Sequence, residues 1–122
     1  MAGGVVHVDW YAAGLRQDFL AAELARAAPL ALRYGATQYS VHRSRTDRYK
    51  ITQMTWFESE RDWYAYWEGP EMIEFRRRNS GKYQIPIVYT WYDELISGAL
   101  GPEVPLNGAP EPEPQPEPTA AT

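Results

Sequence analysis

The sequence contains no cysteine and only two histidines, His7 and His42. Without cysteine the chain can form no disulfide, no thiolate nucleophile and no Cys-ligated zinc or iron–sulfur centre. Two histidines are too few for a histidine-rich metal site within one chain. We therefore expect no metal ion.

Long apolar runs are also missing. No stretch approaches the ~20 apolar residues that a helix needs to cross a bilayer. The first residues, MAGGVVHVDWYAAG, lack the basic and apolar regions of a signal peptide. These absences predict a protein without a membrane span, located in the cytoplasm.

An excess of basic charge is absent as well. The 122 residues include 12 Lys and Arg against 16 Asp and Glu, and four of the glutamates follow residue 101, where no basic residue occurs. The first 101 residues are therefore formally neutral. A nucleic-acid-binding protein depends on clustered Lys and Arg to neutralise phosphates, so we expect no nucleic-acid partner.

Proline divides the chain in two, since seven of its ten prolines fall in residues 102–122, where they alternate with Glu and Gln. Such a segment has almost nothing apolar to bury, which predicts a disordered, acidic, Pro-rich tail. The tail is interpreted either as a solubilising segment or as a contact for a partner. Residues 1–101 are predicted to form one domain.

The domain begins with a strand and a helix. Residues 4–11 alternate, with Val6, Val8 and Trp10 on one face and the intervening side chains, including His7 and Asp9, on the other. A helix follows, because apolar residues recur at helical spacing: Leu15, Phe19, Ala22 and Ala27, with Leu20 and Leu24 beside them. Pro29 is expected to interrupt this helix or to start a short second one, and Gly35 to end it.

The second half repeats this order with an extra strand. Residues 36–43 and 49–57 read as a hairpin around the polar residues 44–48. Ser59 followed by Asp62 has the spacing of a capping box and predicts a helix start. Gly69-Pro70 is expected to break that helix before a further helical stretch over residues 71–78. Residues 83–92 are predicted as the last strand, and Pro86 favours an edge position or a bulge.

A strand–helix–strand–strand–helix–strand order is typical of the α+β, ferredoxin-like fold, a four-stranded antiparallel sheet with helices on one face. The other face would then be bare and rich in aromatic side chains. Such a patch on a domain of this size binds other surfaces. We therefore expect a homodimer formed through the open sheet face.

The stretch TWFESERDWYAYWEGPEMIEFR, residues 55–76, resembles the strand-to-helix segment of the dimeric α+β barrel superfamily, in particular its antibiotic-biosynthesis-monooxygenase (ABM) group. The likeness in topology covers roughly residues 4–95. It implies two sheets paired into a barrel, a pocket between sheet and helices, and oxidation of an electron-rich aromatic substrate by O₂ without a cofactor. In the haem-degrading branch the same register puts Arg76 near the iron ligand, and because arginine cannot ligate iron, haem degradation is disfavoured.

Candidate site residues follow from that resemblance. His7 falls at a polar position of the first strand and is the candidate catalytic base or hydrogen-bond donor, although a satisfied polar residue of the sheet is the simpler interpretation. The predicted ligand-binding residues are Asp9, Phe57, Trp63, Trp67, Arg76 and Tyr83. The aromatic members are also what a hydrophobic core would contain. Arg76 belongs to an Arg76–Arg78 run that alternatively complements the dipole at a helix end.

Two hypotheses about function result. In the first, the chain is a homodimeric barrel that binds a small aromatic or hydrophobic ligand and, as an enzyme, is a cofactor-independent monooxygenase. In the second, it is a non-catalytic homodimeric accessory or assembly module that contacts a partner through its Pro/Glu tail. A fold by itself does not choose between them.

Overall fold

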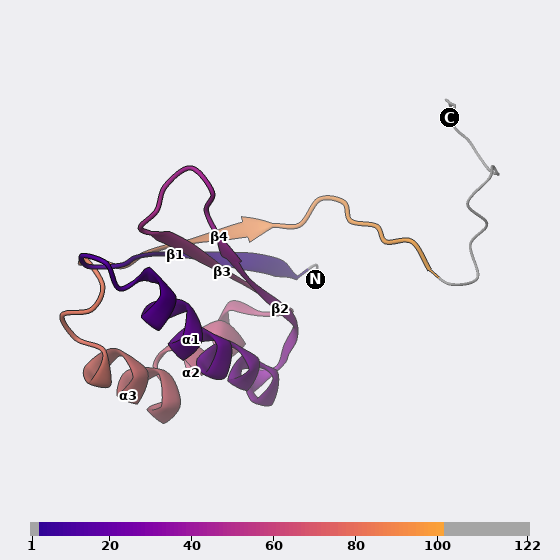
Figure 1. Cartoon of the computed structure of the whole chain (residues 1–122). Coiled ribbons are helices and arrows are strands. Elements are labelled where there is room, and N and C mark those ends of the chain that lie inside the picture. The colour runs from indigo at the N-terminus through magenta and orange to yellow at the C-terminus, as the bar shows by residue number, and fades with distance from the viewer. Residues whose placement is uncertain (1–2, 102–122) are drawn as a thin grey trace, which may run out of the picture.

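The computed structural model describes residues 3–101, in which helices cover one face of an antiparallel sheet (Figure 1). The strands are β1 (Gly4–Tyr11), β2 (Ala36–Arg43), β3 (Lys50–Phe57) and β4 (Val88–Asp93). The helices are α1 (Gln17–Ala27), the 3₁₀ helix η1 (Ala28–Tyr34), α2 (Glu60–Trp67) and α3 (Pro70–Arg78). The predicted tail over residues 102–122 lies outside the described residues.

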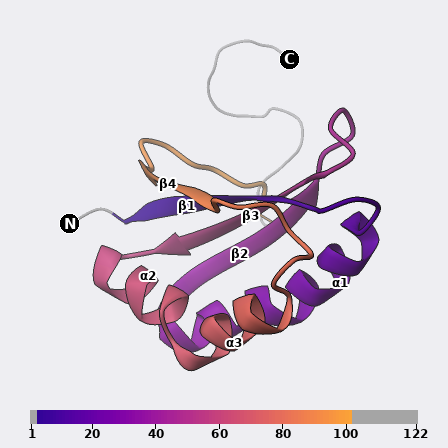
Figure 2. The same ribbon diagram turned by 90° about the vertical axis from the view of Figure 1, so that its left-hand side faces the viewer.

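The sheet has four strands in the order β2-β3-β1-β4, and every neighbouring pair is antiparallel. β1 is central, since Val8 pairs with Gln53 of β3 on one side and with Tyr89 of β4 on the other. Figure 2 shows the helices together below the sheet. The predicted α+β, ferredoxin-like fold class is thereby confirmed.

Side-chain alternation gives the sheet two different faces. Val6, Val8 and Trp10 point toward the helices and are buried. We call the opposite side the open sheet face, because none of the described helices covers it. Its side chains are Val5, His7, Asp9, Tyr11, Ser40, His42, Lys50, Thr52, Met54, Trp56, Val88, Thr90 and Tyr92.

Local signals in the sequence place the helix ends. The Ser59 hydroxyl accepts a hydrogen bond from the backbone N–H of Asp62 at 3.2 Å, which confirms the predicted start of α2. α2 ends before Gly69, and Pro70 occupies the first turn of α3, so the predicted break is also confirmed. Gly35 ends η1 with a φ of 102°, a conformation that glycine adopts without strain.

The buried face of α1 differs from the predicted one. Leu15 precedes the helix, and Phe19 and Ala22 are exposed. The buried row of α1 instead contains Leu20, Glu23, Leu24 and Ala27. Both rows have helical spacing, but only the second continues into η1, where Ala31 is also buried. The Phe19 ring lies at the surface, 4.8 Å from the Lys82 ammonium.

The last strand is shorter than predicted. β4 begins at Val88, whereas Tyr83 makes only an isolated bridge to Ala12. Residues 84–87 lie between, and they include Pro86, which has no N–H to donate to β1. β4 is an edge strand, as the proline suggested.

Gly69 provides a test of how tightly α2 and α3 are joined. A Cβ at this position would lie 2.6 Å from the Ala65 carbonyl oxygen and 3.0 Å from the Tyr34 hydroxyl. We expect Gly69→Ala to lower the free energy of unfolding by about 1–3 kcal/mol, because the backbone of α2 must shift. Gly98→Ala, whose Cβ would meet nothing within 4 Å, should change it by less than about 0.5 kcal/mol. Urea denaturation at one fixed protein concentration measures both; equal effects would contradict the tight junction.

Candidate functional site

Aromatic side chains fill the space between the sheet and helices α2 and α3. We call this set the ring layer; its members are Trp10, Phe57, Trp63, Tyr66, Trp67, Phe75, Tyr83 and Tyr89. At its centre the rings of Trp63 and Trp67 are stacked, with centroids 5.0 Å apart and an interplanar angle of 23°. The two lie four residues apart on α2, which places them on the same face of the helix.

A chain of hydrogen bonds runs through the ring layer. The Trp10 indole N–H donates to Gln53 Oε1 at 3.1 Å, and Gln53 Nε2 donates to the Tyr66 hydroxyl at 3.0 Å. The Tyr66 hydroxyl in turn donates to the Ala27 carbonyl at 3.0 Å. Burial raises the pKa of Tyr66 to about 12. Because each donor has an acceptor, these groups hold β1, β3, α1 and α2 together without an energetic penalty for burial.

Arg76 borders the ring layer at the end of α3. Its guanidinium carbon lies 4.2 Å from the centroid of the Trp67 ring, and Nη2 donates to the Trp67 carbonyl at 2.8 Å. Burial lowers the pKa of Arg76, although an arginine stays charged in a protein. The Tyr83 hydroxyl donates to the Arg76 carbonyl at 3.3 Å, and burial raises the pKa of Tyr83.

Two buried donors at this place have no acceptor within the described part of the chain. They are Trp63 Nε1 and Arg76 Nη1, and both residues contact the Trp67 ring. The Thr55 hydroxyl, on the helix side of β3 beside Phe57, is a third buried polar group without a partner. A buried donor without an acceptor calls for an explanation such as a water or a ligand.

Tyr89 covers the two tryptophans from the edge of the sheet. Its ring centroid lies 5.4 Å from that of Trp63 and 5.8 Å from that of Trp67. Tyr89 is 38% exposed, whereas Trp63 is only 1% exposed. Since no described strand lies outside β4, Tyr89 is the member of the layer closest to solvent on that side.

The predicted ligand-binding residues Phe57, Trp63, Trp67, Arg76 and Tyr83 therefore come together in or against the ring layer. Phe57 contacts Trp63 at a centroid distance of 5.9 Å. Tyr83 joins through Trp10, at 5.2 Å. This arrangement agrees with a shared site and also with the alternative that these rings are core.

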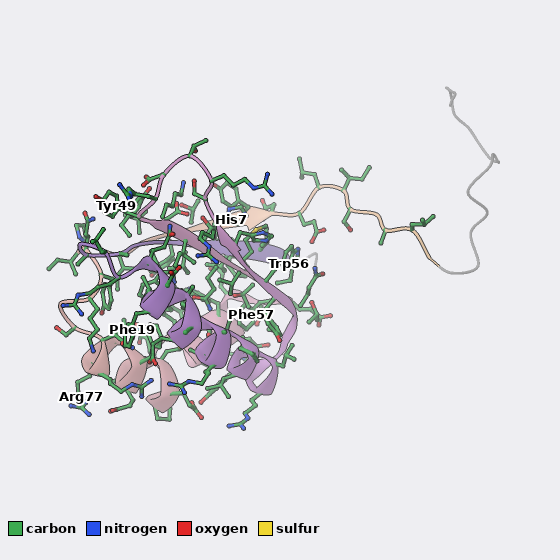
Figure 3. All side chains as sticks on the ribbon, viewed as in Figure 1. His7, Phe19, Tyr49, Trp56, Phe57 and Arg77 are labelled. Carbon is green, nitrogen blue, oxygen red and sulfur yellow. The ribbon has the colours of Figure 1, made fainter. Side chains whose placement is uncertain are left out.

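His7 and Asp9 lie elsewhere, on the open sheet face. Figure 3 shows His7 and Phe57 on opposite sides of the sheet. The His7 ring lies 4.6 Å from that of Tyr92, and Asp9 accepts a hydrogen bond from the Thr52 hydroxyl at 2.9 Å. The candidate base and the candidate ring-binding residues are thus separated by the sheet, because consecutive residues of a strand point to opposite faces.

The three arginines at the end of α3 have three different surroundings. Arg76 contacts Trp67, whereas Arg77 pairs with Glu74 at 2.7 Å. Arg78 donates to the buried Glu23 at 2.8 Å, and this hydrogen bond lowers the pKa of the Glu23 carboxyl. All three lie in the last turn of α3, as the dipole interpretation requires, and each also binds a specific group.

Several residues of this region were not among the predicted site residues: Trp10, Gln53, Tyr66 and Tyr89. Gln53 could have been recognised from the sequence, since it is a polar residue at an inward-facing position of a strand with alternating side chains. Among residues 3–101 there is no group of three or more His, Asp or Glu placed to hold a metal ion. None of the described helices is both long and apolar enough to cross a membrane.

Solved structures with the same fold are numerous. A putative antibiotic biosynthesis monooxygenase from Bordetella bronchiseptica superposes with a TM-score of 0.70 at 16% identity, covering 79% of this chain and 100% of that chain. A second, from Nitrosomonas europaea, gives 0.69 at 14% identity over 76% and 90% of the two chains. SnoaB, a cofactor-independent oxygenase from Streptomyces nogalater, gives 0.66 at 10% identity over 80% and 97%. No protein-family model and no curated protein matches the sequence. The expected resemblance to ABM proteins is confirmed at the level of the fold.

Tyr66 makes the stability of the ring layer depend on pH. Between pH 10 and pH 12 the unfolded chain, with its tyrosine pKa near 10.0, loses a proton that folded Tyr66 keeps. Stability from this group is therefore complete below pH 10 and is lost as pH rises toward 12. We expect Tyr66→Phe to have a lower free energy of unfolding than wild type at pH 8. At pH 11 this difference between the two proteins should be smaller by about 1 kcal/mol. Urea denaturation at both pH values tests this, with the exposed Tyr39→Phe as control; an unchanged gap would contradict it.

Proposed function

We propose that this chain acts as a homodimer that binds a small, flat, negatively charged aromatic compound against Trp67 in the ring layer. The observation that supports the ligand is the pair of buried donors, Trp63 Nε1 and Arg76 Nη1, that have no acceptor in the described residues and lie beside the same indole. The chemistry of these groups defines the class of ligand.

The donors favour a ligand that carries oxygen acceptors. A buried donor without an acceptor costs about 1–3 kcal/mol, which a suitably placed ligand oxygen recovers. Arg76 favours an anion, because hydrogen bonds between ionised groups are stronger than neutral ones. The surrounding rings favour a flat aromatic body through stacked and edge-to-face contacts. A naphthoate or a phenolate meets all three conditions.

Access to this site would be under the edge of the sheet. Tyr89 is more exposed than the tryptophans that it covers, and among residues 3–101 no outer strand restrains β4. Rotation of the Tyr89 side chain would uncover the edges of Trp63 and Trp67 together. A site of this kind is closed without ligand and opens by a side-chain movement.

The reaction proposed for such a ligand is oxidation by O₂ without a cofactor, the activity in the description of the Streptomyces nogalater structure. Conversion of a CH₂ group that lies between aromatic rings to a carbonyl consumes one O₂: one oxygen atom stays in the product, and the other leaves as water with the two hydrogens. The substrate would bind as its own anion, which Arg76 stabilises.

The proposal of a homodimer rests on the apolar and aromatic side chains of the open sheet face. Val88 and Tyr92 are exposed on it, and Met54 and Trp56 are partly exposed beside them. An apolar and aromatic surface on a sheet of this size, without a helix to cover it, is typical of an interface. A second copy presents an identical surface and can cover it symmetrically.

A non-catalytic assembly module is the second candidate. Its support is the dense packing of the ring layer, in which Trp10 and Trp63 are each only 1% exposed. In this alternative the rings are core, and function resides in the surfaces of the dimer. Binding measurements with a matched pair of ligands separate the two candidates.

The test uses quenching of tryptophan fluorescence by 2-naphthoate and by its neutral analogue 2-naphthamide. We expect 2-naphthoate to bind at least about tenfold more tightly, because only the anion forms a hydrogen bond with Arg76 in which both partners are ionised. Arg76→Gln should remove this preference. Arg77→Gln is the matched control, since Arg77 is exposed and pairs with Glu74, and it should keep the preference.

Saturable quenching with the expected preference, lost only in Arg76→Gln, would support the ligand site. Absence of saturable quenching by either compound would contradict it and favour the assembly module. An equal loss in the Arg76 and Arg77 variants would also contradict it, since it would reflect net charge rather than a site.

A further inference from the structure

Three loops meet at one end of the domain: the loop before α1, the β2–β3 hairpin and the loop before β4. Backbone hydrogen bonds join them. The Ala12 N–H donates to the Tyr49 carbonyl at 2.7 Å, and the Ala13 N–H donates to the Lys82 carbonyl at 3.0 Å. We call this region the loop end; it comprises residues 12–19, 43–50 and 79–87.

Basic residues are concentrated at the loop end. Residues 1–101 are formally neutral, with 12 basic residues balanced by 12 acidic ones. The loop end holds six of these basic residues but only two of the acidic ones, Asp18 and Asp47, so its net charge is +4. Its basic residues are Arg16, Arg43, Arg45, Arg48, Lys50 and Lys82.

Both carboxylates of the loop end are already engaged, whereas most of its cations are not. Asp18 pairs with Arg43 at 2.6 Å, and Asp47 accepts a hydrogen bond from the Tyr49 N–H at 3.0 Å. The five other cations form no ion pair with any described residue. The loop end therefore presents positive charge that attracts an anionic partner.

Large apolar side chains are exposed in the same region. Leu15, on the loop before α1, is 86% exposed, and Ile85, on the loop before β4, is 80% exposed. Phe19, in the first turn of α1, is 43% exposed. Figure 3 shows Phe19 and Tyr49 at the same end of the domain. Exposed apolar side chains that share a surface with free cations indicate a site of interaction.

A hollow lies between the start of α1 and the β2–β3 hairpin. Its volume is about 210 Å³, and its lining includes Gln17, Asp18, Arg48 and Tyr49. The side-chain nitrogen of Gln17 is buried and has no acceptor among residues 3–101. Because Arg43 neutralises Asp18, Arg48 and the Gln17 amide remain as donors for an anionic oxygen.

The combination of cations and aliphatic side chains favours a lipid surface over other anionic partners. The phosphates of a nucleic acid would bind the cations but would give exposed aliphatic side chains nothing apolar to contact. An acidic protein would need a matching pocket for each of Leu15 and Ile85, which lie on separate loops. The fluid acyl region of a bilayer accepts apolar side chains at any spacing, while cations bind the anionic head groups above it.

We propose that the loop end docks this protein onto membranes that contain anionic phospholipids, with Leu15 and Ile85 inserted at the boundary between head groups and acyl chains. The cations of the loop end then lie among the lipid phosphates, and the hollow beside Arg48 receives one head group. This docking is independent of a ligand in the ring layer, which lies between the sheet and helices α2 and α3, and so goes beyond the proposed function.

Co-sedimentation of the full chain with vesicles tests the docking. We expect binding to phosphatidylcholine vesicles that contain about 30% phosphatidylglycerol, and at least about tenfold weaker binding to phosphatidylcholine alone. An increase in salt from about 0.05 M to about 0.5 M should weaken binding to the anionic vesicles by a similar factor, because salt screens the attraction. Absence of binding to the anionic vesicles at the lower salt would overturn the proposal.

Charge reversal tests which cations take part. Arg45→Glu with Arg48→Glu should weaken binding to the anionic vesicles at least about tenfold, since each basic residue near such a surface contributes about fivefold. The control is Arg33→Glu with Arg61→Glu, which changes net charge equally at exposed positions of η1 and α2. It should bind like wild type, and circular dichroism should show that both variants are folded. An equal loss in both would overturn the loop end as the docking surface.

Insertion of the aliphatic side chains has its own test. Leu15→Ser with Ile85→Ser should weaken binding to the anionic vesicles at least about tenfold, because the inserted apolar area is lost. Leu32→Ser with Ile73→Ser, at half-exposed positions of η1 and α3, is the control and should bind like wild type.

A soluble polyanion separates a lipid surface from an acidic protein. We expect poly-glutamate to bind the full chain at least about tenfold more weakly than the anionic vesicles, because it offers no apolar phase. Equal binding to poly-glutamate and to vesicles, unchanged in Leu15→Ser with Ile85→Ser, would overturn the lipid surface and favour an acidic protein partner.

Discussion

The two-residue alternation along β1 is the constraint on which the rest of the structure depends. Because β1 is the central strand, its side chains decide what lies on each face of the sheet. Val6, Val8 and Trp10 meet the helices, and Trp10 connects the ring layer to Gln53 and Tyr66 by hydrogen bonds. Val5, His7 and Asp9 form the middle of the open sheet face. A shift of one residue in register would move each set of side chains to the opposite face, so that neither the buried face nor the open sheet face would keep its present residues.

The ring layer is both part of the core and the proposed ligand site, and its two sides differ in how well their polar groups are satisfied. Trp10, Gln53 and Tyr66 have every hydrogen bond that burial requires, which is typical of a rigid core. Around Trp67 the pattern is different, since Arg76 and Trp63 bring buried donors without acceptors into an aromatic environment. The layer is thus fully satisfied toward α1 and under-satisfied toward α3 and β4. Proteins tolerate such local deficits at functional sites when the remaining core is stable enough.

The sequence predicted most of the fold because its signals are local. Ser59 before Asp62 and Gly69 before Pro70 act through neighbouring backbone groups, so their outcome depends little on tertiary context. The face of α1 was harder, because two apolar rows compete and only the contact with the sheet decides between them. The site was harder still to predict. The resemblance indicated which residue types to expect in a site, but His7 and Phe57 lie on opposite faces of the sheet. Arg76 and Arg77 are adjacent residues of the same type, so the sequence does not distinguish them. Only the fold places Arg76 against the Trp67 indole and Arg77 beside the Glu74 carboxylate.

β4 connects the two proposed activities. It supplies Tyr89 to the ring layer and Tyr92 to the open sheet face. A ligand that displaces Tyr89 must move a side chain on the same short edge strand that a second copy would cover through Tyr92. If dimerisation restrains β4, it also alters the free energy of opening the ring layer. Linkage is reciprocal, so a ligand that requires this opening changes the affinity of the two copies by the same factor as dimerisation changes the affinity for the ligand. An edge strand, with one neighbour instead of two, is the element of this sheet that can move without disrupting the core.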